Sequence, residues 1–126
     1  MVGLVLISHS ARLAEEAVAL AVGIAGDDAP IRPAGGTDDG GLGTSLTKLE
    51  TAVAEVDQGD GVVVLMDLGS AVLTARAFVE DRPDVVLADA PFIEGAISAL
   101  VTAGTGADLA AVLAAAEEAR TIGKLC

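Results

Sequence analysis

Apolar runs alternate with amphipathic stretches along the chain, and this alternation predicts an α/β fold. Residues 2–7 and 61–66 are almost unbroken apolar runs with many β-branched members. A half-exposed strand would alternate apolar and polar residues, so these runs predict strands buried on both faces of a parallel sheet. Residues 31–34 and 84–88 are two further strand candidates. Prolines in and beside residues 31–34 remove two ladder donors and predict a short edge strand there.

Apolar residues at helical spacing predict an amphipathic helix after each strand, and Gly104-Thr105-Gly106 splits the last helical stretch in two. The first helix has an apolar stripe that is expected to face the core. Hydroxyl side chains before the second and third helices are candidate N-caps, with Thr44 or Ser45 for the second and Ser70 for the third. The expected helices span residues 12–25, 46–57, 70–80, 92–103 and 109–116. The apolar stripe of the first consists of Leu13, Ala17, Leu20, Ala21 and Ile24.

Strands that alternate with helices predict a parallel sheet with right-handed crossovers. The simplest arrangement is a doubly wound, mainly parallel four-stranded sheet in the order 2-1-3-4, flanked by helices. At 126 residues the chain is about one domain's worth. We therefore expect residues 1–126 to form a single domain, in which residues 121–126 are a frayed tail, a linker or a short edge strand.

Composition excludes several classes of partner. Seven Lys and Arg against 19 Asp and Glu give a formal net charge of −12, which disfavours nucleic acid and anionic lipid. The chain has no Trp or Tyr and only two Phe, so no aromatic platform could stack bases. No apolar run approaches the roughly 20 residues that cross a bilayer. Residues 1–3 lack the basic flank of a signal peptide and the single Cys126 cannot form an internal disulfide, so the cytoplasm is the expected location.

Candidate chemistry centres on the only histidine, His9, which follows the first strand directly. Ser8 and Ser10 flank it and helical sequence follows, so His9 is expected in a tight strand-to-helix turn. Asp67 follows the third strand in the same way. In the order 2-1-3-4 the switch point lies between strands one and three, where such folds bind ligands. The topology therefore predicts that His9 and Asp67 are neighbours, with the glycine-rich loop 35–45 folded over the same crevice.

A histidine beside a carboxylate suits phosphoryl transfer through a phosphohistidine. Asp67 can accept a hydrogen bond from the protonated ring nitrogen and stabilise positive charge while the other nitrogen bonds phosphorus. The candidate donors to the phosphoryl oxygens are Gly36, Thr37, Gly69 and Ser70. No metal or cofactor is expected.

Two other functions fit parts of the pattern. A receiver-type signalling domain has the same fold class and would use Asp67 as its phosphoryl acceptor. Such a domain expects paired acids after strand one, where this chain has Ser8-His9-Ser10. A non-catalytic module could bind a small ligand or nucleotide with the glycine-rich loop, although no Walker-type or G-x-G-x-x-G run follows strand one. In purely structural terms, His9 and Asp67 could each be no more than a helix cap.

Four motifs, in this order, resemble those of one family. V-L-I-S-H-S at 5–10, A-G-G-T-D-D-G-G-L-G-T-S at 34–45, V-L-M-D-L-G-S-A at 64–71 and A-D-A-P-F-I-E-G-A at 88–96 are similar to the mannose-type enzyme IIA domain of the DhaM family, the phosphotransfer subunits of the phosphoenolpyruvate-dependent dihydroxyacetone kinase. The resemblance implies an enzyme IIA-like phosphotransferase subunit that acts through a phosphohistidine.

The resemblance also implies specific partners. His9 would accept phosphate from the phosphocarrier protein HPr and donate it to ADP held on the DhaL subunit. DhaL would then phosphorylate dihydroxyacetone bound by DhaK. Many relatives carry HPr-like and enzyme I-like domains behind this one, and we expect those functions in separate proteins or in a part of the gene not included here. The resemblance and the high apolar fraction of 52% together predict a homodimer.

Overall fold

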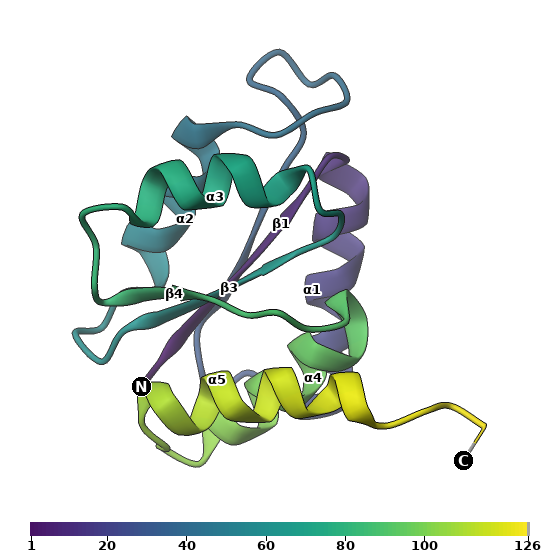
Figure 1. The fold of residues 1–126 in the computed structure, drawn as a ribbon, viewed down its shortest axis with the longest axis vertical. Coiled ribbons are helices and arrows are strands. Elements are labelled where there is room, and N and C mark those ends of the chain that lie inside the picture. The colour runs from purple at the N-terminus through teal and green to yellow at the C-terminus, as the bar shows by residue number, and fades with distance from the viewer. Residues whose placement is uncertain (126) are drawn as a thin grey trace.

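Four parallel strands form one sheet in the computed structural model of the chain, which describes residues 1–125 (Figure 1). The sheet order is β2-β1-β3-β4, and every pair of neighbours is parallel. This arrangement confirms the predicted fold class and strand order. The strands are β1 (Gly3–Ser8), β2 (Ile31–Gly35), β3 (Val62–Met66) and β4 (Val85–Leu87).

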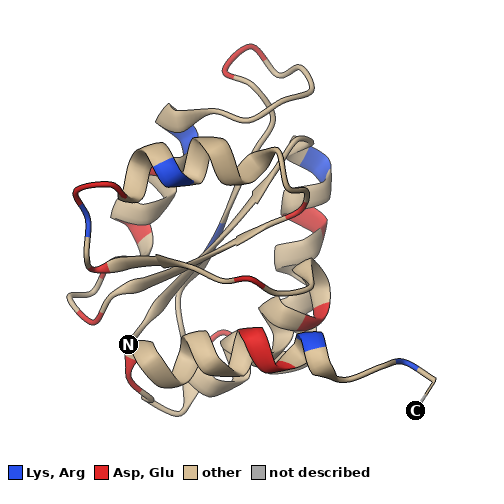
Figure 2. Ribbon diagram, viewed as in Figure 1, with Lys and Arg blue, Asp and Glu red and all other residues tan. Residues whose placement is uncertain are grey.

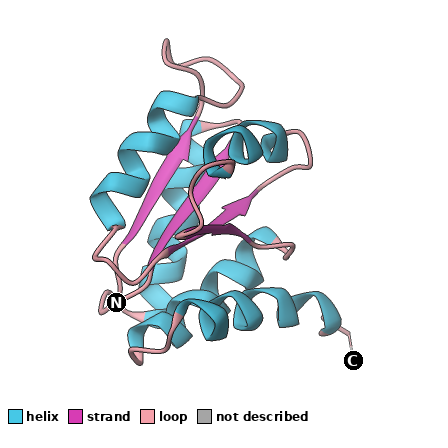
Figure 3. Cartoon of the chain, turned by 60° about the vertical axis from the view of Figure 1, so that its left-hand side comes forward, coloured by secondary structure: helices cyan, strands magenta, loops and turns pink. Residues whose placement is uncertain are grey.

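Helices cover both faces of the sheet (Figures 1 and 3). Strand β1 shows how the two faces are filled, since Leu4 and Leu6 face one hydrophobic cluster while Val5 and Ile7 face the other, all without solvent exposure. The first cluster includes residues of α1 (Ala11–Ala25), α4 (Phe92–Gly104) and α5 (Leu109–Glu118). The second includes residues of α2 (Leu46–Val56) and α3 (Ala71–Val79). The unbroken apolar run is thus explained by burial on both sides.

The apolar stripe predicted for α1 is wrong at three positions. Leu13, Leu20 and Ile24 are 46%, 48% and 61% exposed, whereas the buried face consists of Ala14, Ala17 and Ala21. At its first turn α1 approaches the sheet closely, and the residue that faces the sheet there is Ala14. A Cβ placed on Gly35 in β2 would lie 2.5 Å from the Ser10 carbonyl oxygen and 2.9 Å from the Ala14 Cβ.

The outer edge of β2 is protected from pairing with another strand. Pro33 has no N–H, the Ile31 carbonyl accepts a hydrogen bond from Arg32, and the Gly35 carbonyl accepts one from Lys48 Nζ at 2.9 Å. Such features prevent edge-to-edge association of sheets. The predicted edge position of this strand is therefore confirmed.

The C-terminal segment contains a short 3-10 helix, η1 (Ala119–Thr121), and no strand through residue 125. The edge strand considered for residues 121–126 is therefore absent from the described part, while Cys126 lies outside it. Helix α3 ends at Val79, one residue earlier than predicted. No helix in residues 1–125 has the length and apolar character needed to span a bilayer.

Two glycine substitutions test the close packing of α1 on the sheet. Gly35→Ala should destabilise the protein by about 1 to 3 kcal/mol, because its Cβ would overlap backbone atoms. Gly23→Ala should stabilise it by about 0.5 to 1 kcal/mol, because Gly23 is exposed within α1 and no atom lies within 4 Å of the added Cβ. Urea denaturation at one protein concentration measures both changes. Equal effects of the two substitutions would contradict the packing described.

Candidate active site

The predicted meeting of His9 and Asp67 is present in the structure. Pairing of Ile7 with Met66 across β1 and β3 places the two residues that follow these strands side by side. His9 Nδ1 lies 3.0 Å from Asp67 Oδ1. A carboxylate accepts hydrogen bonds and cannot donate one when ionised, so the ring proton belongs on Nδ1.

Asp67 is held in a nearly closed environment. Its side chain is 7% exposed, and its second oxygen accepts hydrogen bonds from Ser8 Oγ at 2.9 Å and the His9 backbone N–H at 3.1 Å. Burial raises the pKa of Asp67, but the hydrogen bonds from His9 and Ser8 favour the ionised form and bring the pKa below its ordinary value. Asp67 is therefore a carboxylate at neutral pH.

Ser70 contacts the other ring nitrogen of His9. Its Oγ lies 2.8 Å from Nε2, which carries a lone pair when the proton is on Nδ1, so the hydroxyl donates to Nε2. Ser70 was predicted to cap α3, but its side chain makes no capping hydrogen bond. The histidine ring satisfies the hydroxyl instead. The three side chains of Asp67, His9 and Ser70 form one hydrogen-bonded chain in which Nε2 is the ring nitrogen with the lone pair.

Ser8 organises this site and was missed as a site residue in the sequence. It is fully buried, donates to Asp67 and accepts a hydrogen bond from the Ser10 backbone N–H at 3.0 Å. Ser10 in turn caps α1 by accepting from the Leu13 N–H at 3.2 Å, as a hydroxyl before a helix predicts. The available signal for Ser8 was a hydroxyl at the end of an otherwise apolar strand.

The glycine-rich loop reaches the site through backbone contacts. The Gly43 N–H donates to the His9 carbonyl at 2.9 Å, and the Gly36 N–H donates to the Ser8 carbonyl at 3.1 Å. The Thr37 N–H donates to the Gly41 carbonyl, and the Thr37 hydroxyl donates to Asp39. The predicted donors Gly36 and Thr37 thus lie in this loop, with these groups already bonded within the protein.

The turn between β3 and α3 provides backbone donors that the protein leaves unused. Within residues 1–125, the N–H groups of Gly69 and Ser70 have no acceptor. Both precede the first turn of α3, where unpaired N–H groups and the helix dipole favour an anion. Of the four predicted phosphoryl-binding residues, Gly69 and Ser70 therefore retain free backbone N–H groups beside His9.

A pocket of about 530 Å³ opens beside this turn, between α3 and the carboxyl end of β4. Asp67 and Gly69 contribute to its wall, and Arg76 adds a positive charge from α3. Its remaining lining residues are Met66, Leu68, Val72, Leu87, Ala88, Asp89 and Ala90.

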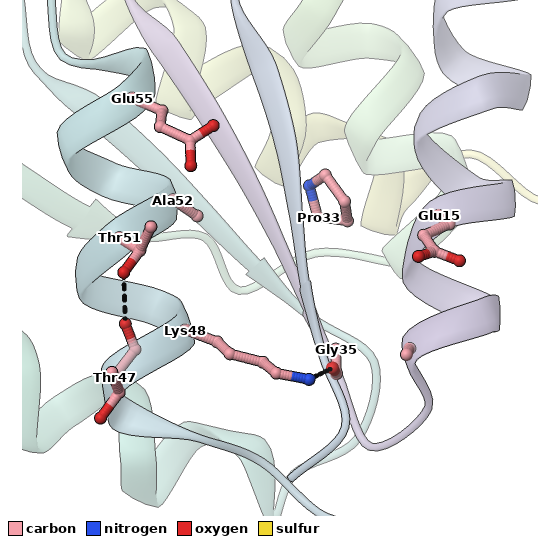
Figure 4. Close-up of a pocket in the computed structure, with 9 residues that line it drawn as sticks. Glu15, Pro33, Gly35, Thr47, Lys48, Thr51, Ala52 and Glu55 are labelled. Atoms are coloured by element: carbon pink, nitrogen blue, oxygen red, sulfur yellow. Dashed lines mark hydrogen bonds between the residues drawn. The ribbon is translucent and has the colours of Figure 1, made fainter. Parts of the chain in front are cut away.

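A second pocket, of about 270 Å³, lies at the outer edge of β2 (Figure 4). Lys48 crosses it to reach the Gly35 carbonyl, and the carboxylates of Glu15 and Glu55 flank it. None of the predicted site residues lines this pocket. The chemistry predicted from the sequence therefore belongs to the site around His9 and not to this pocket.

This geometry favours His9 over Asp67 as a phosphoryl acceptor. Both carboxylate oxygens of Asp67 accept hydrogen bonds, and only 7% of its side chain is exposed. The His9 side chain is 27% exposed, and its Nε2, which carries the lone pair, is hydrogen-bonded only to a hydroxyl that can rotate away. The arrangement suits nucleophilic catalysis by an imidazole that an adjacent carboxylate orients.

The chain is similar in sequence and in fold to known proteins. Residues 3–113 match the EIIA-man family model, described as the PTS system fructose IIA component. The chain is 39% identical to the phosphoryl donor subunit DhaM of the PEP-dependent dihydroxyacetone kinase of Escherichia coli strain K12, over 90% of this chain and 26% of that protein. It thus spans about a quarter of that relative's length.

Two further similarities cover nearly whole proteins. The phosphoryl donor subunit DhaM of PEP-dependent dihydroxyacetone kinase 2 from Listeria innocua is 32% identical, over 80% of this chain and 85% of that protein. The crystal structure of EF1359, a protein of unknown function, has a TM-score of 0.81 and 30% identity, over 93% of each chain.

The low pKa of Asp67 predicts how the protein responds to acid. A carboxylate whose pKa is lowered on folding stabilises the protein at pH values above its ordinary pKa of 3.8. This contribution is lost as the pH falls through the folded-state pKa. Replacing Asp67 with Asn should remove this part of the pH dependence. The difference in unfolding free energy between parent and Asp67→Asn protein should therefore shrink as the pH is lowered from about 6 to about 2. Urea titrations at each pH measure it, and a difference that stays constant would contradict the assignment.

Proposed function

Because the chain belongs to the EIIA-man family of PTS system fructose IIA components, and its relatives include DhaM proteins, we propose that it is the phosphoryl donor subunit of a PEP-dependent dihydroxyacetone kinase. The observation that carries the proposal is the hydrogen-bonded chain from Asp67 through His9 to Ser70, which leaves Nε2 as the nucleophile.

In the loading step, the lone pair of His9 Nε2 attacks the phosphorus of phosphorylated HPr. The phosphorus–nitrogen bond of the donor breaks, and its electron pair returns to the donor's imidazole. In the structure, Ser70 Oγ lies 2.8 Å from Nε2, and this hydrogen bond has to break before the new bond forms. The hydroxyl and the free N–H groups of Gly69 and Ser70 are then available to the phosphoryl oxygens.

Asp67 stabilises the charge that loading creates. The ring keeps its Nδ1 proton while Nε2 binds phosphorus, so it becomes positively charged next to the Asp67 carboxylate 3.0 Å away. Because the ring keeps the same proton, it leaves as a neutral imidazole when the phosphoryl group is passed on. Neither step requires a proton to enter or leave the site.

In the unloading step, an oxygen of the β-phosphate of ADP, held on the DhaL subunit, attacks the phosphoryl group on His9. The bond to Nε2 breaks, its electron pair stays on the imidazole, and ATP forms on DhaL. DhaL then phosphorylates dihydroxyacetone bound by DhaK. The protein thus acts as a carrier that is regenerated in each cycle.

We also propose that the protein works as a homodimer that buries the exposed apolar face of α1. Leu13, Leu20 and Ile24 recur at helical spacing on this helix, and each is 46% to 61% exposed. Burial of such side chains against a second copy removes apolar surface from water. The strand edge at β2 is unsuited to this contact, because Arg32 and Lys48 occupy its carbonyl groups.

Phosphorylated HPr provides the test of the site. Incubation with it should add one phosphoryl group, detected by mass spectrometry, and the label should be acid-labile and alkali-stable, as a phosphoramidate is. His9→Ala protein should remain unlabelled. Asp67→Asn should keep the fold but slow single-turnover loading on the order of 10²-fold, because one charge-assisted hydrogen bond of about 2 to 3 kcal/mol is lost from the transition state.

Folding of both variants is controlled by their thermal midpoints and far-ultraviolet circular dichroism. Labelling of folded His9→Ala protein would refute the proposed acceptor. A hydroxylamine-sensitive label on Asp67 would support a receiver-type domain instead. An unchanged loading rate in Asp67→Asn protein would assign the orientation of His9 to another group.

Light scattering tests the homodimer. The parent should have the mass of two chains at micromolar concentrations, and Leu20→Glu should lower that mass by placing a charge in the α1 contact. Leu73→Glu, at a 72% exposed position on α3, is the matched control and should remain dimeric. A parent with the mass of one chain throughout the concentration range would exclude the dimer.

A further inference from the structure

Nearly all the basic side chains of this acidic protein are engaged. The sequence has seven Lys and Arg, and in the described residues 1–125 only Arg12 and Arg76 make neither an ion pair nor a hydrogen bond through their side chains. They lie on α1 and α3, where each is the single basic residue of its helix and marks a blue segment in Figure 2. The engaged side chains are Arg32 with Glu55, Lys48 with the Gly35 carbonyl, Arg82 with Asp84, Arg120 with Asp89, and Lys124 with Glu94.

Arg76 lies where its free charge can meet a ligand. It lines the 530 Å³ pocket together with Asp67 and Gly69, on the same helical face as Val72 one turn earlier. The pocket also contains Asp89, but that carboxylate already pairs with Arg120 at 2.6 Å. The Asp67 carboxylate is hydrogen-bonded to His9 Nδ1 and Ser8 Oγ. In the loaded state proposed above, the positively charged His9 ring offsets the Asp67 carboxylate 3.0 Å away, and Arg76 is then the charged group of the pocket without a partner, which makes the pocket suited to an anion.

The two steps of the proposed function differ in the anions that they bring. Phosphorylated HPr brings a single phosphoryl group, whereas ADP brings a diphosphate. The diphosphate has to approach a protein with a net charge of −12, which opposes its binding. An arginine offers planar, paired donors that match phosphate oxygens, and it is charged at every physiological pH.

On the basis of the proposed function, we propose that Arg76 binds the diphosphate of the acceptor nucleoside diphosphate during unloading. The phosphoryl group on His9 then lies at the Gly69–Ser70 turn, and the nucleotide phosphates enter the adjoining pocket. Arg76 offsets their charge while the β-phosphate oxygen forms its bond to phosphorus and Nε2 keeps the electron pair of the broken bond. Arg76 is thus an acceptor-side binding residue that has no role in loading.

Single-turnover kinetics separate the two steps. Loading is followed from phosphorylated HPr, and unloading is followed from the isolated phosphorylated protein mixed with increasing amounts of ADP-loaded DhaL. Arg76→Gln should load within about twofold of the parent rate and unload on the order of 10- to 100-fold more slowly at saturating DhaL, the loss of a charged hydrogen bond to phosphate. Arg76→Lys should restore part of the rate, because it keeps the charge without the paired donors.

Arg32→Gln is the matched control. It removes the same charge from an exposed position on β2 outside the pocket, so both of its rates should equal those of the parent. Arg76→Gln unloading at the parent rate, or loading and unloading slowed equally, would overturn the proposal. A change confined to the half-saturating concentration of DhaL would also overturn it, since Arg76 would then contact the partner protein and not the nucleotide. Failure of the parent to load His9 at all would refute the proposed function itself.

Discussion

The hydrogen bond between His9 Nδ1 and Asp67 Oδ1 is the interaction on which the account of this protein depends. It decides which ring nitrogen keeps the proton and which one remains nucleophilic. The fold sets its geometry, since the register of β1 and β3 brings the two strand ends together and the Asp67 N–H donates to the Ile7 carbonyl at 3.1 Å. Two residues 58 positions apart in sequence thereby form one rigid unit.

Electrostatics explains why this unit sits within so acidic a protein. Asp67 is nearly buried, yet three donors keep it ionised, and its charge matches the positive charge that the ring gains in the proposed loading step. On the other side of the ring lie hydrogen-bond donors, the Ser70 hydroxyl and the free N–H groups that precede α3, which in the proposed mechanism contact the phosphoryl group. The site thus places a carboxylate against one ring nitrogen of His9 and hydrogen-bond donors near the other. Such preorganised dipoles stabilise charge without reorganising at the moment of transfer.

Much of this architecture could be predicted from the sequence because it follows from local patterns. Unbroken apolar runs indicated doubly buried strands, and their alternation with helices gave the strand order and placed His9 beside Asp67. What could not be predicted depended on close packing and on competition between partners. The buried face of α1 consists of alanines and its leucines are exposed, and the close approach of the first turn to Gly35 is a distance that only the assembled fold shows. Ser70 was expected to cap a helix, but the nearby imidazole is an alternative partner that no local rule includes.

In the proposed mechanism, Asp67 reserves Nδ1 for a proton so that Nε2 receives the phosphoryl group. The chain has a single histidine, so labelling histidine with ¹⁵N gives two ring signals, both from His9. Nuclear magnetic resonance of the protein before and after loading with phosphate can then observe each nitrogen separately. We expect a proton on Nδ1 in the unloaded protein and a one-bond coupling between phosphorus and Nε2 in the loaded one. A phosphorus coupling to Nδ1, or a free ring whose proton resides on Nε2, would contradict it.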